Sequence, residues 1–183
     1  MKKLLLSLML ILISQLANAG VVSIEQLNKV NKLNDVFSIK VVGSDFDYPL
    51  EGFGLNIDFE DSILELLSVT VDSNIWEFHQ TAGERSAGKV AKIGGASFKG
   101  VENNILFAIL DFKAIGIGIS DLIISDANHR TVVWSDLTLS DIPLDFKNAQ
   151  VQVVPIPAAF WLMFSGVASL LAIGRTKKLK YPL

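Results

Sequence analysis

The chain has 183 residues, 50% of them apolar, with 16 lysines and arginines, 19 acidic residues and no cysteine. All 19 acidic residues lie between Gly20 and Val154 beside ten basic residues, so this region carries a net charge of −9. Such a charge argues against nucleic-acid binding, which needs clustered lysine and arginine to neutralise phosphates. The lack of cysteine excludes disulfides, thiolate metal sites and cysteine nucleophiles. One domain is expected, because domains typically run to about 100–200 residues.

The first 19 residues have the pattern of a secretory signal peptide. Met1-Lys2-Lys3 precedes an apolar run from Leu4 to Leu16, which ends in Ala17-Asn18-Ala19. A positive start, an apolar stretch and an A-x-A sequence predict export, with a signal peptidase cutting between Ala19 and Gly20. The alternative, an uncleaved membrane anchor, needs about 20 apolar residues and is disfavoured by the shorter run.

An uncharged apolar run from Ile156 to Gly174 is followed at once by a basic tail, residues 175–183. A helix over 156–174 would cross most of the roughly 30 Å hydrocarbon layer of a bilayer. Basic residues stay on the cytoplasmic side, so this transmembrane helix would place the preceding domain outside. The alternative is a core helix, which would have to be buried on every face while ending beside cations.

The start of this run resembles a known sorting signal. Val154-Pro155-Ile156-Pro157-Ala158, with Trp161-Leu162 behind it and cations after the apolar run, is similar to the VPLPA-type PEP-CTERM signals of bacteria. Ile156 departs from the leucine that this variant usually carries. The resemblance implies that an exosortase, a membrane transpeptidase-like cysteine protease, recognises residues 155–183 and cuts near Pro155–Ala158. It also implies sorting to the surface or exterior of a Gram-negative bacterium.

Between these segments, short alternating apolar runs separated by Gly, Asp, Asn and Ser predict an all-β fold, an antiparallel sandwich. In residues 52–59, Phe53, Leu55 and Ile57 share one face, which predicts a half-buried strand. Residues 104–112 are apolar on both faces, which predicts a central strand. The other predicted strands are 36–42, 64–71, 90–93 (ending at Gly94-Gly95), 122–124, 132–134 and 149–154. Residues 25–33 have a weak helical period and are the candidate helix.

The order of these motifs resembles the cohesin-like domains. Phe37–Val42 is followed by the strand over 52–59, an acidic turn, the Leu-Glu strand from Leu64 and then Phe107–Ala114. The resemblance covers about residues 22–154 and implies a jelly-roll sandwich with a binding function. Two departures are a missing proline at Asp61-Ser62 and Lys32–Asp35 in place of Val-Gly-Asp. Related carbohydrate-binding sandwiches share this pattern, and dockerin binding, the best-known activity of the cohesin family, is a weaker expectation for this chain than the fold.

Two patterns suggest enzyme chemistry, and each has a simpler alternative. Gly83–Lys89 fits G-x-x-x-x-G-K, but Val90 stands where a P-loop needs a hydroxyl and no helical pattern follows, so an exposed hairpin loop is predicted. Ser86 and Lys89 also match S-x-x-K, without the partner motifs of that chemistry. His79 and His129 are candidate general bases that lie near no nucleophile motif, so both are expected in loops.

Acidic and aromatic side chains supply the candidate binding sites. Two acidic groups, Asp45 with Asp47 and Asp58 with Glu60 and Asp61, could bind Ca²⁺ but lack the EF-hand spacing, which favours solvated turns. Trp76, Phe78 and Trp134 could form a sugar-stacking face, although aromatic residues fill cores equally well.

These patterns together predict a non-enzymatic, exported surface module. It would consist of a signal peptide (1–19), a sandwich (20–154) and a sorting signal (155–183), with no catalytic residue, cofactor or metal site. The expected partners are signal peptidase, an exosortase, the membrane, and a protein or polysaccharide ligand in adhesion or in the extracellular matrix. The alternative is a secreted carbohydrate-binding module, released once the tail is cut. An enzyme is the least supported class, because no catalytic constellation withstands its simpler alternative.

Overall fold

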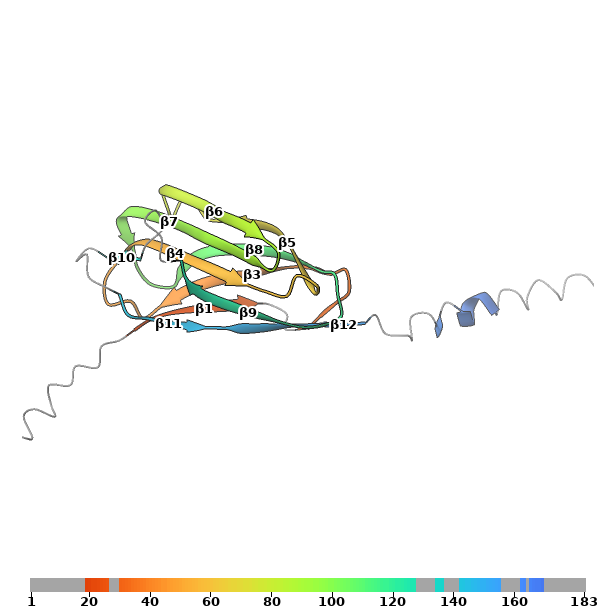
Figure 1. Ribbon diagram of the computed structural model, residues 1–183. Coiled ribbons are helices and arrows are strands. Elements are labelled where there is room, and N and C mark those ends of the chain that lie inside the picture. The colour runs from red at the N-terminus through yellow and green to blue at the C-terminus, as the bar shows by residue number, and fades with distance from the viewer. Residues whose placement is uncertain are drawn as a thin grey trace, which may run out of the picture.

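The computed structural model describes residues 19–26, 30–127, 134–136, 142–155, 162–163 and 165–169. In these ranges the chain forms twelve strands arranged in two sheets that pack face to face (Figure 1). The predicted all-β sandwich is therefore confirmed. Residues 162–163 and 165–169 are helical, and no helix within the described ranges has the length and hydropathy of a membrane span. Residues 1–18 and most of the predicted helix over 156–174 lie outside the described residues.

The smaller sheet has five strands in the order β11-β1-β3-β8-β5. Their bounds are Leu144–Lys147 (β11), Gly20–Gln26 (β1), Val36–Ser44 (β3), Ile105–Ala114 (β8) and Leu64–Thr70 (β5). All neighbours are antiparallel except β11 and β1, which run parallel. β8 has a strand on each side, as its sequence predicted.

The larger sheet has seven strands in the order β2-β12-β9-β4-β7-β6, with β10 paired to the start of β4. Their bounds are Val30–Lys32 (β2), Ala149–Val154 (β12), Gly118–Asp126 (β9), Leu50–Asp58 (β4), Lys89–Val101 (β7), Phe78–Ser86 (β6) and Ser135–Asp136 (β10). The predicted half-buried strand is β4, with Phe53, Leu55 and Ile57 fully buried on its inner face. The predicted strand over 149–154 is β12.

Two segments pass from one sheet to the other on the same side of the sandwich. β1 in the smaller sheet is followed by β2 in the larger one, and β11 is followed by β12 after Asn148. Gln26, at the end of β1, links these two connections because its Nε2 donates a hydrogen bond to the carbonyl of Gln150 on β12 (2.7 Å). The chain enters the sandwich at one end, at Gly20, and leaves it at the opposite end, at Val154 (Figure 1).

Aromatic rings from both sheets form the centre of the core. Phe53 lies 4.6 Å from Trp76 and 5.0 Å from Phe107, and Phe107 lies 5.2 Å from Trp134, between ring centroids. Trp76 is fully buried and donates from Nε1 to the carbonyl of Leu106 (2.9 Å), so its polar atom is satisfied. Trp76 therefore belongs to the core and the partly buried Trp134 packs against it, so a sugar-stacking face built on these two rings is wrong.

Two expectations about individual segments are also wrong. Residues 25–33 form no helix in their described part, because Gln26 ends β1 and Val30–Lys32 pairs with β12 as β2. The strand that starts at Val90 does not end at Gly94-Gly95 but continues to Val101 as β7. At Gly95 a Cβ would lie 2.8 Å from the Cβ of Trp76, so this glycine admits the tryptophan rather than ending the strand.

Candidate functional site

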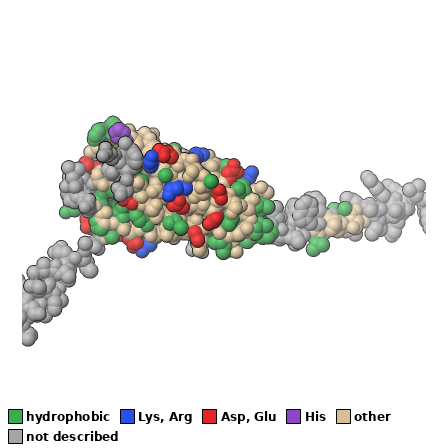
Figure 2. Space-filling model, viewed as in Figure 1, with side chains coloured by type: hydrophobic (Ala, Val, Ile, Leu, Met, Phe, Trp, Pro, Cys, Tyr) green, Lys and Arg blue, Asp and Glu red, His purple; other side chains and the backbone are tan. Residues whose placement is uncertain are grey.

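A pair of exposed phenylalanines stands on the β6–β7 hairpin. Phe98 has 77% of its surface exposed and Phe78 has 40%, and their ring centroids are 4.0 Å apart with the planes tilted by 60°. Phe78 pairs with Ala96, two residues before Phe98, so both rings point to the outer face of the larger sheet. We call these two residues the aromatic pair. Figure 2 shows hydrophobic side chains gathered beside the histidine at this end of the molecule.

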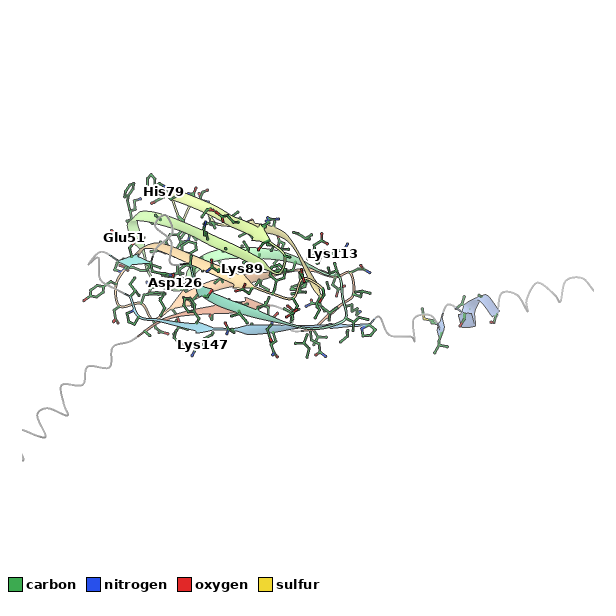
Figure 3. All side chains as sticks on the ribbon, in the orientation of Figure 1. Glu51, His79, Lys89, Lys113, Asp126 and Lys147 are labelled. Atoms are coloured by element: carbon green, nitrogen blue, oxygen red, sulfur yellow. The ribbon has the colours of Figure 1, made fainter. Side chains whose placement is uncertain are left out.

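A bulge in β6 and one carboxylate hold the aromatic pair in place. The register shifts between Phe78 and Thr81, and His79 has a left-handed backbone with φ of 50°. Such a bulge re-aims the neighbouring side chain, here Phe78 toward Phe98. Glu77 Oε2 accepts hydrogen bonds from Ser97 Oγ (3.1 Å) and from the backbone N–H of Phe98 (3.3 Å). His79, which was expected in a loop, is therefore an exposed residue of β6 (Figure 3).

A groove of about 1160 Å³ lies where the chain crosses between the sheets. Ile24, Val30, Ile119 and Ile123 give it apolar walls, and amide side chains such as Gln152 give it polar ones. Ile119 and Ile123 project from β9 with 56% and 45% of their surfaces exposed. This groove is an apolar feature separate from the aromatic pair, because neither Phe78 nor Phe98 lines it.

The segment with P-loop spacing is a tight hairpin. Gly83–Ser86 ends β6, Ala87 and Gly88 form the turn, and Lys89 begins β7. A phosphate cradle needs backbone N–H groups at a helix N-terminus, which this hairpin does not present. Lys89 Nζ instead pairs with Asp58 Oδ1 at 3.1 Å. The predicted hairpin is confirmed, with a shorter turn than expected.

The other candidate groups do not assemble into a reactive site in the described part of the chain. The backbone N–H of Glu60 donates to Ser120 Oγ (3.0 Å), and Asp45 accepts from Ser44 Oγ (2.8 Å). Across the described ranges, no three His, Asp or Glu side chains gather closely enough to hold a metal ion. His129 lies outside the described residues, as do Ile156, Pro157 and Ala158 of the sorting motif, whereas Val154 ends β12 and Pro155 follows it.

Asp111 is the centre of a polar contact on the outer face of the smaller sheet. Ser38 Oγ on β3 donates to its Oδ1 at 2.6 Å, and Ser68 Oγ on β5 donates to its Oδ2. These two bonds favour the carboxylate and hold the pKa of Asp111 below its ordinary value of 3.8. One side chain of β8 is thus bonded to both neighbouring strands.

Asp111→Asn is expected to lower the free energy of unfolding near neutral pH by less than about 1 kcal/mol, because water screens this exposed group. The folded pKa lies below the unfolded one, so the carboxylate stabilises the fold above pH 3.8 and less as the pH falls through the folded pKa. Denaturant titrations should show the gap between parent and variant closing in acid. In a Ser38→Ala, Ser68→Ala background the gap should vanish; an unchanged gap would contradict this assignment.

Comparison with known proteins identifies the fold. The sequence matches no family model and no curated protein. The sixth cohesin of scaffoldin B from Acetivibrio cellulolyticus, solved in complex with a dockerin, superposes with a TM-score of 0.62 at 17% identity, over 74% of this chain and 99% of that one. The seventh ScaB type I cohesin of Pseudobacteroides cellulosolvens gives 0.58 at 18% identity, over 76% and 94%.

A cohesin from outside the cellulosome extends this likeness. The non-cellulosomal cohesin of the archaeon Archaeoglobus fulgidus superposes with a TM-score of 0.58 at 11% identity, over 74% of this chain and 91% of that one. Each of these three domains is matched over at least nine-tenths of its own length. At such identities the likeness establishes the fold, and this chain contains a cohesin-like two-sheet β-sandwich.

Proposed function

We propose that the sandwich is a non-catalytic module that binds a protein partner through the aromatic pair. The observation that carries this proposal is the exposure of two packed phenylalanine rings on a hairpin fixed by Glu77. Covering an aromatic side chain yields about 1.5–3 kcal/mol of hydrophobic free energy, and aromatic residues are enriched at the centres of interfaces. Cohesins of the same fold have been solved in complexes with dockerins, which are protein ligands.

A protein fits the aromatic pair better than a polysaccharide does. The two rings are tilted by 60° and share no flat platform on which a sugar ring could stack. Of the larger rings that such a platform could have used, Trp76 is fully buried in the core and Trp134 is partly buried against it. Adhesion or matrix association would then proceed through a protein ligand.

Export with loss of residues 1–19 is part of the same proposal. Gly20, the residue after the predicted cut, is the first residue of β1, and its backbone N–H donates to the carbonyl of Pro143 (2.9 Å). Gly20 is buried, and a Cβ there would overlap the ring of Phe46. A cut between Ala19 and Gly20 would therefore leave the whole of β1 in the mature protein.

Anchoring by residues 156–174 and recognition of the sorting motif by an exosortase complete the proposal. The hydroxyls of Ser165 and Ser169 donate to the carbonyls of Leu162 (2.9 Å) and Ser165 (2.7 Å), which lowers the cost of placing them in lipid. A cut after Pro155 would spare every residue of β12, since that strand ends at Val154. The mature domain would then lie on the cell surface or outside the cell.

Photo-crosslinking in the producing cells tests the binding site. A photoreactive amino acid at position 98 should yield a discrete adduct with a protein, and the same residue at position 67 should not. Leu67 is the matched control, because it is 41% exposed but lies on β5 of the other sheet. Phe98→Ala should then weaken binding of the purified partner about 30-fold, the effect of a hot-spot residue worth about 2 kcal/mol.

Two results would count against the binding proposal. Equal adducts from positions 98 and 67 would show that the aromatic pair has no dedicated partner. Binding to a polysaccharide that is lost in Phe98→Ala would assign the pair to the carbohydrate-binding alternative.

A further inference from the structure

Five exposed aliphatic side chains gather at the end of the sandwich where the chain leaves β12. They are Val30, Val36, Ile115, Ile117 and Ile119, with exposed fractions of 53%, 63%, 42%, 58% and 56%. We call this set the exit rim. Figure 2 shows hydrophobic side chains at this end of the molecule, next to the outgoing chain. Apolar side chains clustered in water at one end of a domain indicate a covering partner.

Strand pairing places each part of the exit rim close to Val154. Gln152 of β12 lies between its two register partners, Val30 on β2 and Ile119 on β9. The backbone N–H of Leu33, in the turn after β2, donates to the carbonyl of Val154 (3.2 Å). The other three members of the exit rim are Val36, which begins β3, and Ile115 and Ile117, which lie in the loop between β8 and β9.

Val36 and Ile115 reach the same end of the sandwich from the smaller sheet. Val36 begins β3 and pairs with Lys113, and Lys113 lies at the exit end of the molecule (Figure 3). The loop that carries Ile115 and Ile117 is fixed to the residue before β5, because the backbone N–H groups of Ile115 and Gly116 both donate to the carbonyl of Ile63 (2.8 and 3.1 Å). The exit rim is thus a built surface rather than a set of loose side chains.

The distance from the exit rim to the predicted anchor is very short. β12 ends at Val154, and the uncharged apolar run begins at Ile156, so Pro155 is the whole spacer. An extended chain spans at most about 3.6 Å per residue, which places Ile156 within about 7 Å of Val154. The interfacial layer of a bilayer is itself about 5–7 Å deep on each side. A helix that starts at Ile156 inside the membrane would therefore hold this end of the sandwich at the lipid surface.

We infer that the exit rim is a lipid-contacting surface, which seats the sandwich on the outer leaflet of the membrane that holds its anchor. This inference rests on the proposed anchoring, and it adds that the folded domain itself touches the bilayer. Lys32 and Lys113 lie beside the exit rim, but so does Asp35, and Glu60 and Asp61 occupy the neighbouring turn. With charges of both signs present, the contact depends on the aliphatic side chains and not on anionic lipid.

Single cysteines can report on this contact, because the chain has none of its own. Ile117→Cys is labelled with a polarity-sensitive fluorophore in the chain that retains residues 155–183, reconstituted in phosphatidylcholine vesicles. Tyr48→Cys is the matched control, since Tyr48 is 56% exposed against 58% for Ile117 and lies in the loop between β3 and β4 at the opposite end. Val36→Cys samples the exit rim from the other sheet.

The labels at positions 117 and 36 should show blue-shifted emission, a several-fold loss of quenching by aqueous iodide, and quenching by lipids spin-labelled near the headgroup. The label at position 48 should remain fully open to iodide. The emission shift at position 117 should persist at high salt, because an apolar contact is not screened.

Vesicle flotation separates failure of this inference from failure of the anchor. If the chain does not float with the vesicles, the anchoring proposal falls, and the exit-rim inference falls with it. If it floats but position 117 is as open to iodide as position 48, the exit rim does not touch lipid and the anchor stands. Protection from iodide without quenching by spin-labelled lipid would assign the exit rim to a protein neighbour and overturn the inference.

Discussion

Replacing Trp76 with alanine is expected to lower the free energy of unfolding by about 3–5 kcal/mol, the range for truncating a buried tryptophan or phenylalanine. Trp76 is fully buried, and its ring lies 4.6 Å from Phe53 of the larger sheet and 6.0 Å from Phe107 of the smaller one. Its Nε1 also donates to the carbonyl of Leu106 on β8. The substitution therefore leaves a cavity between the sheets and removes the hydrogen bond that ties the connection between β5 and β6 to β8. Denaturant titration followed by far-UV circular dichroism measures the loss.

Two further variants separate the parts of this effect. Trp76→Phe keeps most of the ring but leaves the carbonyl of Leu106 without its donor, so a smaller loss of about 1–3 kcal/mol is expected. Phe98→Ala removes an aromatic side chain that is 77% exposed, and its effect on stability should stay within about 0.5 kcal/mol. If Trp76→Ala cost no more than Phe98→Ala, the position of Trp76 in the core would be contradicted.

Ser165→Arg is expected to release the protein from membranes, because a charge at the centre of a spanning helix costs about 2.5–3.5 kcal/mol on insertion scales. Ser165 is the midpoint of the apolar run over 156–174. Its hydroxyl is satisfied by the carbonyl of Leu162, whereas a guanidinium has five donors that the backbone of one helix cannot satisfy. Fractionation of the producing cells should move the protein from the membrane pellet to the soluble fraction.

Thr176→Arg is the matched control for this variant. It adds the same charge within the basic tail, residues 175–183, beyond the predicted span, and retention should be unchanged. Equal retention of both variants would contradict the spanning helix, and equal loss would point to a general effect of charge on expression or folding.

The strands with a clear period were predictable from their own residues. In β4 the alternation of Phe53, Leu55 and Ile57 with smaller or polar residues reports which face is buried. The same reasoning found β3 and β12, whose inner positions are apolar and whose outer positions are polar or partly exposed. β8 was predicted differently, as a central strand, because its residues are apolar on both faces. For such strands the local pattern and the tertiary environment carry the same information.

Other segments depend on partners far away in the chain. β6 is largely exposed and polar, and it becomes a strand because β7 pairs with it along most of its length. The sequence Gly94-Gly95 is typical of a strand end, but Gly95 is needed inside β7 because Trp76 packs against it, and the sequence alone does not reveal that contact. Gln26 and Val30 are strand residues because of pairing with β3 and β12, which no local period reveals.

The candidate site was predicted only in part for a related reason. Phe78 was a candidate from the start, but of its expected companions Trp76 is buried in the core and Trp134 packs against the core. Its actual companion, Phe98, follows the Gly94-Gly95 pair at which the strand was expected to end. Exposure of a phenylalanine depends on which face its strand presents, and that required the register of β6 against β7.

The end-to-end path of the chain has a mechanical consequence. If the protein is tethered through Val154 and holds its partner at the aromatic pair near the far end, tension runs lengthwise along β12. That strand is joined to β9 by five antiparallel register pairs, whose hydrogen bonds are perpendicular to the pull, and to β2 by three parallel pairs, whose hydrogen bonds are slanted. Such bonds share the force in shear and must rupture together, whereas a strand peeled from its end loses them singly. The tether therefore leaves the fold through a strand that is paired on both sides and loaded in shear.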